Sequence, residues 1–310
     1  MTDQAAALEA THAPAFLAQD RAPRSWLGLA ATVFSLGVIS VALYQARGLN
    51  FDNLRALVPR TPAFWAAFVL AYLAAPVSEW LIYRRLWRVG PEAIFPLLRK
   101  QVYNELLLGY LGDAYFYGWA RRRLALSCAP FGTVKDVAVM SAMAGNAMTA
   151  LMVALAMPFA GLLSLGGHGE AVGWSLAIVL VSSFAVVFLR GKIFSLERRQ
   201  LAFVFGVHLA RIAAAAVLGA VAWHLVLPAT SVVWWLLLAA MRLVISRLPF
   251  LPNKDVVFAG AAVFALGRDV EIGALMTMIA GLILALHIFV GIAFALADLV
   301  NGGSHEQRPA

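Results

Sequence analysis

Long apolar runs separated by short, arginine-rich polar segments dominate this chain. A helix needs about 20 mostly apolar residues to cross the hydrocarbon core of a membrane. The runs that we predict as full transmembrane helices are Trp26–Tyr44, Ala63–Ile82, Val137–Leu163, Trp174–Leu189, Leu201–Leu225 and Ile272–Leu299. The pattern predicts an all-α, polytopic membrane protein, with about six full spans in a single helical domain over residues 26–300.

One stretch in the first half, Lys100–Arg123, does not fit this scheme, because it holds Glu105 and Asp113 and ends in three arginines. Read as one helix, it places Tyr103, Leu106 and Asp113 on the same face. A carboxylate at bilayer depth costs about 2.5–3.5 kcal/mol, so the polar positions should meet protein or water and not lipid. We predict a re-entrant or deeply inserted amphipathic element that does not cross fully.

The second half contains a corresponding irregular region. Val232–Ile245 and Val256–Leu266 are apolar but short, and Pro249 and Pro252 break the backbone between them. Two half-length helices around such a break can form a re-entrant or discontinuous pair where protein or water covers the open backbone. One broken region in each half of the chain is typical of transporter binding sites.

Basic residues concentrate in the polar segments between the apolar runs, and the formal net charge is +8. In a soluble chain this charge would suggest nucleic acid as a partner, but 62% of the residues are hydrophobic and the mean hydropathy is +0.82. Loop arginines and lysines orient membrane proteins with their basic side toward the cytoplasm. We therefore predict a multi-pass inner-membrane protein with no nucleic-acid partner and with both termini cytoplasmic. Residues 1–25 are expected to be disordered, and residues 301–310 to form a polar tail.

Cofactor and metal chemistry find little support in the sequence. Cys128 is the only cysteine, which excludes intrachain disulfides and cysteine metal clusters. Gly-rich phosphate loops, HExxH zinc helices and GxSxG elbows do not occur in the sequence. We predict no cofactor, no metal site and no catalytic residue, and we favour a non-enzyme over an enzyme.

Arg211 is the most informative candidate, because it lies ten residues into a predicted span and so near mid-membrane, with His208 one turn away. A guanidinium stays charged and needs a partner, and the available intramembrane acids are Glu79, Glu105 and Asp113. Two interpretations stand side by side: a buried ion pair that fixes helix register, or a substrate-binding cation.

The ends of both irregular regions carry further candidates. Arg121 opens the arginine triplet, which is either an orientation signal or a cradle for an anionic headgroup. A helix after Pro252 would offer its N-terminus to a phosphate, unless Asp255 in its first turn satisfies that terminus. The substrate-binding candidates are Asn104, Glu105, Asp113, Arg121, Arg211, Arg247 and Lys254, and the structural ion-pair candidates are Glu79, His208 and Asp255.

The chain resembles the flippase-like transmembrane family that includes the membrane domain of lysylphosphatidylglycerol synthases. The resemblance rests on the basic loop RRLWR after an early span, on YNELLLGYLGDAYFYGWARRR, and on the late proline break LPFLPNK. Asn104, Gly112, Asp113 and Arg121 are loose counterparts of the family's Asn-Leu-x-Pro-type turn and Gly-Gly-Asp-x-x-Arg-like motif. The proline and the glycine pair of those motifs are missing here, and so is the family's Pro-Gly-Gly-like run in the late break.

This resemblance implies the handling of lipids or lipid-linked glycans. The first hypothesis is binding and translocation of an anionic lipid or lipid phosphate, with Arg121, Arg211 and Lys254 taking the charge, and Glu105 or Asp113 holding the arginines when the site is empty. The second is an integral membrane transferase with Asp113 or Glu105 as the base. The third is a non-catalytic membrane subunit that packs against another protein, for example a partner transferase.

Overall fold

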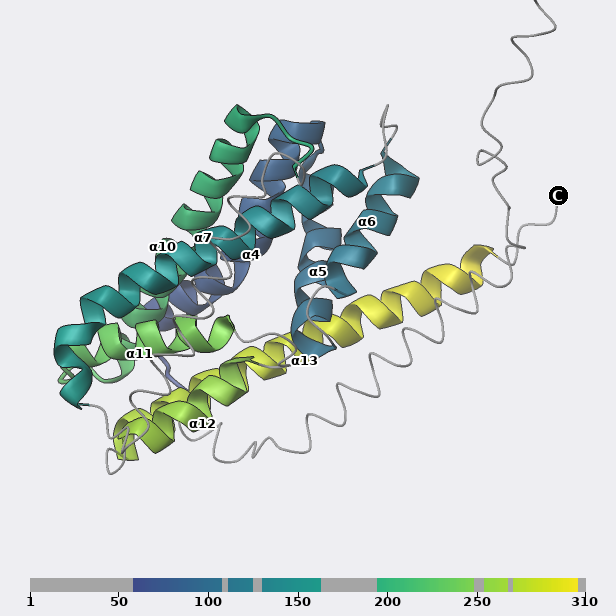
Figure 1. The fold of residues 1–310 in the computed structure, drawn as a ribbon. Coiled ribbons are helices and arrows are strands. Elements are labelled where there is room, and N and C mark those ends of the chain that lie inside the picture. Colours follow the sequence, from purple (N-terminus) through teal and green to yellow (C-terminus); the bar gives the residue numbers. More distant parts are fainter. Residues whose placement is uncertain are drawn as a thin grey trace, which may run out of the picture.

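The computed structural model describes residues 58–107, 111–124, 130–162, 194–247, 254–266 and 270–305, and every regular element in these ranges is helical (Figure 1). The α-helices are α4 (Pro62–Trp87), α5 (Ile94–Leu106), α6 (Leu111–Arg123), α7 (Phe131–Ala156), α10 (Arg198–Val226), α11 (Val232–Ser246), α12 (Lys254–Leu266) and α13 (Val270–His305). Short 3-10 turns at Pro91–Ala93 and Met157–Leu162 precede α5 and follow α7. The predicted all-α class is therefore confirmed for the described residues.

Four helical stretches are long and apolar enough to cross a membrane by length and composition: Pro62–Trp87, Phe131–Leu162, Arg198–Val226 and Glu271–Asp298. They correspond to the predicted spans that begin at Ala63, Val137, Leu201 and Ile272. The predicted spans Trp26–Tyr44 and Trp174–Leu189 and the N-terminal segment over residues 1–25 lie outside the described residues. Helix α13 continues to His305, past the predicted end of its span at Leu299.

Helices α4 and α10 form a central antiparallel pair with the most extensive contact between any two helices of the described part. At one end, Phe64 and Phe68 of α4 share a buried cluster with Trp223 of α10. At the other end, the guanidinium of Arg85 lies over the ring of Phe203, 5.5 Å from its centroid. Because the two helices run in opposite directions, the segments that follow them begin at opposite ends of the molecule.

The interpretation of Lys100–Arg123 as a single helix was wrong, because this stretch contains the end of α5 and all of α6. The backbone leaves the helical conformation at Leu107, where φ is −103° and ψ is −93°, and the chain then turns back. Tyr103 packs edge-on against Tyr115 with ring centroids 5.2 Å apart, as expected for two antiparallel helices. Each helix has 13 residues, about 20 Å of length against about 30 Å of hydrocarbon, a geometry suited to an element that enters a membrane and returns.

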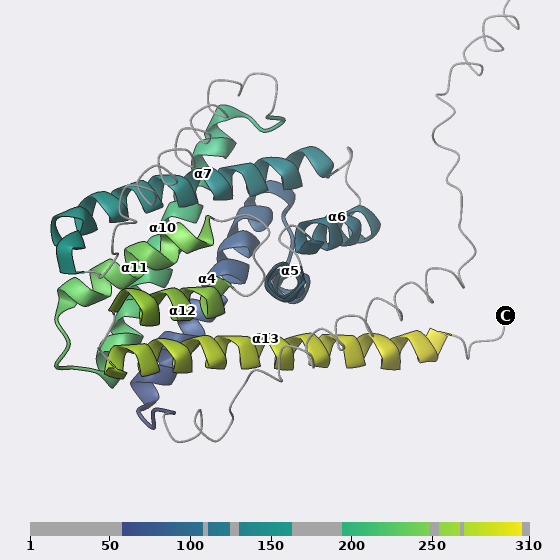
Figure 2. The ribbon, with the colours of Figure 1, turned by 60° about the horizontal axis from the view of Figure 1, so that its bottom comes forward.

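Helices α11 and α12 are the two half-length helices predicted around the proline-rich break, and this prediction is confirmed. Ser231 begins α11 by accepting a hydrogen bond from the Val233 amide at 3.3 Å. The two helices are joined by an ion pair between Arg242 and Asp255. Figure 2 shows α12 lying along α13, with α11 on its other side.

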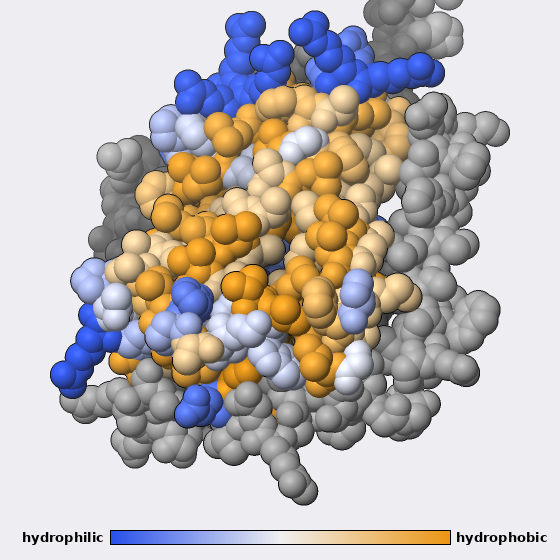
Figure 3. Space-filling model, turned by 90° about the vertical axis from the view of Figure 1, so that its left-hand side faces the viewer, coloured by the Kyte–Doolittle hydropathy of each residue, from blue (hydrophilic) through white to orange (hydrophobic). Residues whose placement is uncertain are grey.

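The outer surface of the described helices is apolar, as expected for residues that face lipid. Large exposed side chains include Leu70, Leu151, Val217 and Phe289. Figure 3 shows this apolar surface below a group of strongly hydrophilic side chains at one end. Exposed arginines lie at the C-terminus of α4 and at the N-terminus of α10, which meet at that end: Arg84, Arg85, Arg88, Arg198 and Arg199.

Candidate functional site

A cavity of about 250 Å³ lies among α4, α5, α10, α11, α12 and α13. Its polar lining residues are Tyr72, Gln101, Glu105, Arg211, Arg242, Arg247, Asp255 and His287. These side chains come from both broken helix pairs and from three of the predicted membrane spans. The cavity is therefore the place where the two irregular regions of the sequence meet.

Small residues on facing helices make room for the cavity, since α4 contributes Ala71 and Ala75 and α10 contributes Ala215, Ala216 and Gly219. Another part of the wall is aromatic and aliphatic, and includes Phe68, Trp223, Phe258, Met276 and Ile279. The cavity thus joins a charged region to an apolar one, and such a lining suits an amphiphilic ligand.

Arg211 reaches the cavity from the middle of α10. Its Nη2 donates a hydrogen bond to Ser141 Oγ at 3.1 Å, while its buried Nε has no hydrogen-bond partner. None of the carboxylates in the described ranges forms an ion pair with Arg211. The predicted partner Glu79 binds Lys100 instead, so Ser141, a neutral residue, is the hydrogen-bond partner of Arg211 within the described residues.

Two more arginines reach the cavity from α11. Arg242 Nε donates to Asp255 Oδ1 at 2.7 Å, so this charge is balanced inside the protein. Arg247 donates from Nε and Nη2 to Ser246 Oγ, at 3.1 Å and 2.9 Å. Gly145 of α7 lies against the guanidinium of Arg247, and any side chain at that glycine would overlap it.

Glu105 lines the same cavity from the end of α5. No hydrogen bond or ion pair joins its carboxylate to another residue of the described segments. Burial, and to a lesser extent the neighbouring Asp255 carboxylate, raises the pKa of Glu105 to about 7, against the opposing effect of Lys254 and Arg242. Glu105 therefore changes its charge near neutral pH.

A second charged cluster lies between the helices and does not line the cavity. The ammonium of Lys100 is 2.8 Å from carboxylate oxygens of both Glu79 and Asp113. Asn104 donates to Asp113 at 3.2 Å and accepts a hydrogen bond from the Gly112 amide at 2.7 Å. Burial alone would lower the pKa of Lys100, but the two carboxylates outweigh it and raise the pKa, so the ammonium stays charged.

The predicted site residues are therefore divided among several places. Glu105, Arg211 and Arg247 line the cavity, whereas Asp113 binds Lys100, and Asn104 binds Asp113 and the amide of Gly112 in the first turn of α6. The sequence analysis offered Asp113 as a partner of the arginines, but in the structure its carboxylate binds Lys100.

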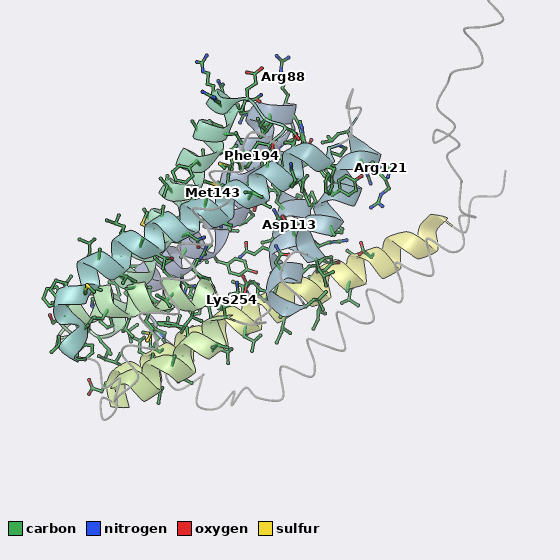
Figure 4. The ribbon with its side chains drawn as sticks, in the orientation of Figure 1. Arg88, Asp113, Arg121, Met143, Phe194 and Lys254 are labelled. Atoms are coloured by element: carbon green, nitrogen blue, oxygen red, sulfur yellow. The ribbon has the colours of Figure 1, made fainter. Side chains whose placement is uncertain are left out.

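The remaining candidates lie outside the cavity lining. Lys254 sits at the start of α12 and donates to the Ser246 carbonyl at 2.9 Å. His208 is fully buried and is not part of the cavity lining. Arg121 is exposed at the end of α6, and Figure 4 shows it pointing away from Asp113 and Lys254.

Several cavity residues were missed by the sequence analysis. Gln101 lies one turn before Glu105 on α5, and this i, i+4 spacing could have placed both on one face. Tyr72 and His287 connect α4 to α13 through a 3.0 Å contact between the Tyr72 hydroxyl and His287 Nδ1. Tyr72 and His287 lie on helices that are far apart in the sequence, so spacing gives no sign that they meet.

Metal ligation receives no support from the described ranges, which contain no group of three or more His, Cys, Asp and Glu side chains placed to hold an ion. The cavity offers electrostatic chemistry: the Arg211 cation with no acidic partner among the described residues, the Glu105 carboxyl with a pKa raised to about 7, and an adjoining apolar wall. No protein-family model, curated protein or solved structure matches this chain.

Proposed function

We propose that this protein binds an anionic membrane lipid or lipid-linked phosphate in the cavity and moves it between the two leaflets. The observation that carries the proposal is Arg211, a cation on the cavity wall with no acidic partner among the described residues. A buried charge without a counter-ion costs several kcal/mol, and a bound phosphate would offset that cost.

The surroundings of Arg211 favour a lipid over a small soluble anion. Phe68, Trp223 and Phe258 continue the cavity as an apolar wall. A small soluble anion would make no favourable contact with that wall. The first carbons of a hydrocarbon chain would bury apolar surface there, with a gain in free energy of about 25 cal/mol per Å². Two broken helix pairs that begin at opposite ends of the molecule give the site a route toward each leaflet.

The test is leaflet exchange of fluorescent phosphatidylglycerol in vesicles that contain the purified protein. Wild type should accelerate exchange, and R211Q should lose most of the gain, because a hydrogen bond to a charged group contributes about 1.5–3 kcal/mol, or roughly 10- to 100-fold. R198Q is the matched control and should behave as wild type, since Arg198 is on the same helix but is exposed at its N-terminus, outside the cavity lining. Equal exchange in vesicles with and without protein would reject translocation.

A membrane transferase is the second candidate, and Glu105 is the observation that favours it. Its carboxylate has no cation partner in the described structure and could accept a proton from a lipid hydroxyl, whereas Asp113 is held by Lys100. Loss of a lipid species in a deletion strain, without accumulation of its precursor in one leaflet, would favour transfer chemistry over translocation.

A further inference from the structure

Two ionisable groups on the cavity wall have no partner of opposite charge among the described residues, and they do not pair with each other. Arg211 approaches from α10, and Glu105 approaches from the end of α5. Arg242 and Asp255, which face the same space, neutralise one another at 2.7 Å. The cavity therefore holds a site for an anion and, separately, a carboxylate that this anion would repel.

We propose that Glu105 is a proton-binding site coupled to the anion site, so that binding of a phosphate group in the cavity is accompanied by uptake of one proton at the Glu105 carboxylate. The inference rests on the proposed function and adds a co-ligand to it. The proton neutralises Glu105 and so removes the repulsion between its carboxylate and the bound anion. The cavity arginines then attract the anion more strongly.

The size of the cavity makes this coupling strong. A space of about 250 Å³ is about 8 Å across, so an anion in it lies within one cavity width of Glu105. At about 7 Å, with an effective dielectric constant of about 20, a negative charge raises a carboxyl pKa by more than one unit. Because burial already raises the pKa of Glu105 to about 7, the bound anion keeps this carboxyl protonated through neutral pH.

The groups that face this space come from every helix around it. They are Tyr72 of α4, Arg211 of α10, Arg242 and Arg247 of α11, Asp255 of α12 and His287 of α13, with Lys254 close behind. Glu105 has a pKa raised into the window from pH 6 to pH 8, and His287 is the one histidine among the described residues that line the cavity. A substitution at each residue therefore separates the two sources of a pH effect.

The experiment measures the affinity of the detergent-solubilised full chain for dioctanoyl phosphatidylglycerol at pH 6 and pH 8. A phosphodiester keeps its charge across this range, so the probe itself contributes no pH dependence. Wild type should bind about tenfold more weakly at pH 8, because a carboxyl with a pKa of about 7 must first take up the proton. E105Q should bind with the pH 6 affinity at both pH values, and H287Q should keep the tenfold ratio whatever its absolute affinity.

Titration calorimetry of wild type in two buffers with different ionisation enthalpies gives the proton count without any variant, and close to one proton should be taken up at pH 8. Binding with the same affinity at both pH values, or an unchanged pH ratio in E105Q, would overturn the coupling and leave the proposed function standing. Absence of probe binding at either pH would overturn both proposals. If E105Q instead loses affinity for dioctanoyl phosphatidylcholine alone, Glu105 pairs with a cationic group of the ligand, and the proton-binding role is wrong.

Discussion

At the residue scale, Lys100 is the cation that neutralises two largely buried carboxylates. It is 4% exposed and lies between the carboxylates of Glu79 and Asp113. The sequence analysis named both acids but assigned them to Arg211. Nothing in the spacing of the residues could correct this, because Lys100 and Glu79 meet only after α5 packs against α4.

Replacing Lys100 with methionine should destabilise the protein strongly. The substitution keeps the aliphatic part of the side chain but leaves two buried carboxylates without their cation, at a cost of about 3–5 kcal/mol. Thermal unfolding in detergent measures the effect. K100M/E79Q should recover part of the loss, since it removes one of the two stranded charges.

D298N is the matched control for this prediction. Asp298 pairs with Arg99 at 2.8 Å, but its side chain is 35% exposed. A partly solvated pair contributes about 0–1 kcal/mol. A loss as large for D298N as for K100M would contradict the central role of the buried cluster.

At the element scale, the α5–α6 pair depends on close approach of the two backbones at Gly112. A Cβ at this position would overlap the carbonyl oxygen of Lys100, and the Gly112 amide also donates to Asn104 at 2.7 Å. The glycine is therefore required for contact between the helices, and the sequence alone gave it no such role.

Substitution of Gly112 by alanine should cost about 1–3 kcal/mol, as overpacking of a fitted contact does, because rigid backbone must move. G118A on the same helix is the control. Its Cβ would meet only the far end of Arg122 at 3.6 Å, so the change should be neutral or slightly stabilising. Melting temperatures of the two variants in one detergent decide the prediction, and equal shifts would contradict it.

Apolar patterning predicts the long apolar helices and the short helices of the broken pairs with different success. Long runs such as those of α4 and α10 mark their helices within a few residues, because burial in lipid depends only on length and hydropathy. The break at Leu107 has no proline, and its position is fixed by packing of α5 against α6. The break between α11 and α12 was predictable because prolines interrupt the sequence there.

At the scale of the whole molecule, the basic side chains predict which end faces the cytoplasm. Exposed arginines at the C-termini of α4 and α6 and at the N-terminus of α10 should lie inside, by the positive-inside rule. The loop between α10 and α11 should then lie outside, because α10 starts at the basic end and is long enough to cross.

Labelling of single cysteines in a C128S background tests this orientation. A membrane-impermeant maleimide should modify A229C from the outer side of intact cells, because Ala229 is exposed in the loop between α10 and α11. R122C should react with the maleimide only after the cells are permeabilised, so that the reagent reaches the cytoplasmic face. The reverse pattern would show that the molecule is inserted the other way round.

The antiparallel arrangement of α4 and α10 has a consequence for the barrier between the two aqueous phases. The α5–α6 pair and the α11–α12 pair begin at opposite ends, and Glu105 near the C-terminus of α5 lies within electrostatic reach of Lys254 at the start of α12. We expect the barrier between the two aqueous phases to be thinnest at the depth of Glu105 and Lys254, where it consists of the tips of short helices. A displacement of only one tip would connect the central chamber to one phase while the other tip kept it sealed from the opposite phase.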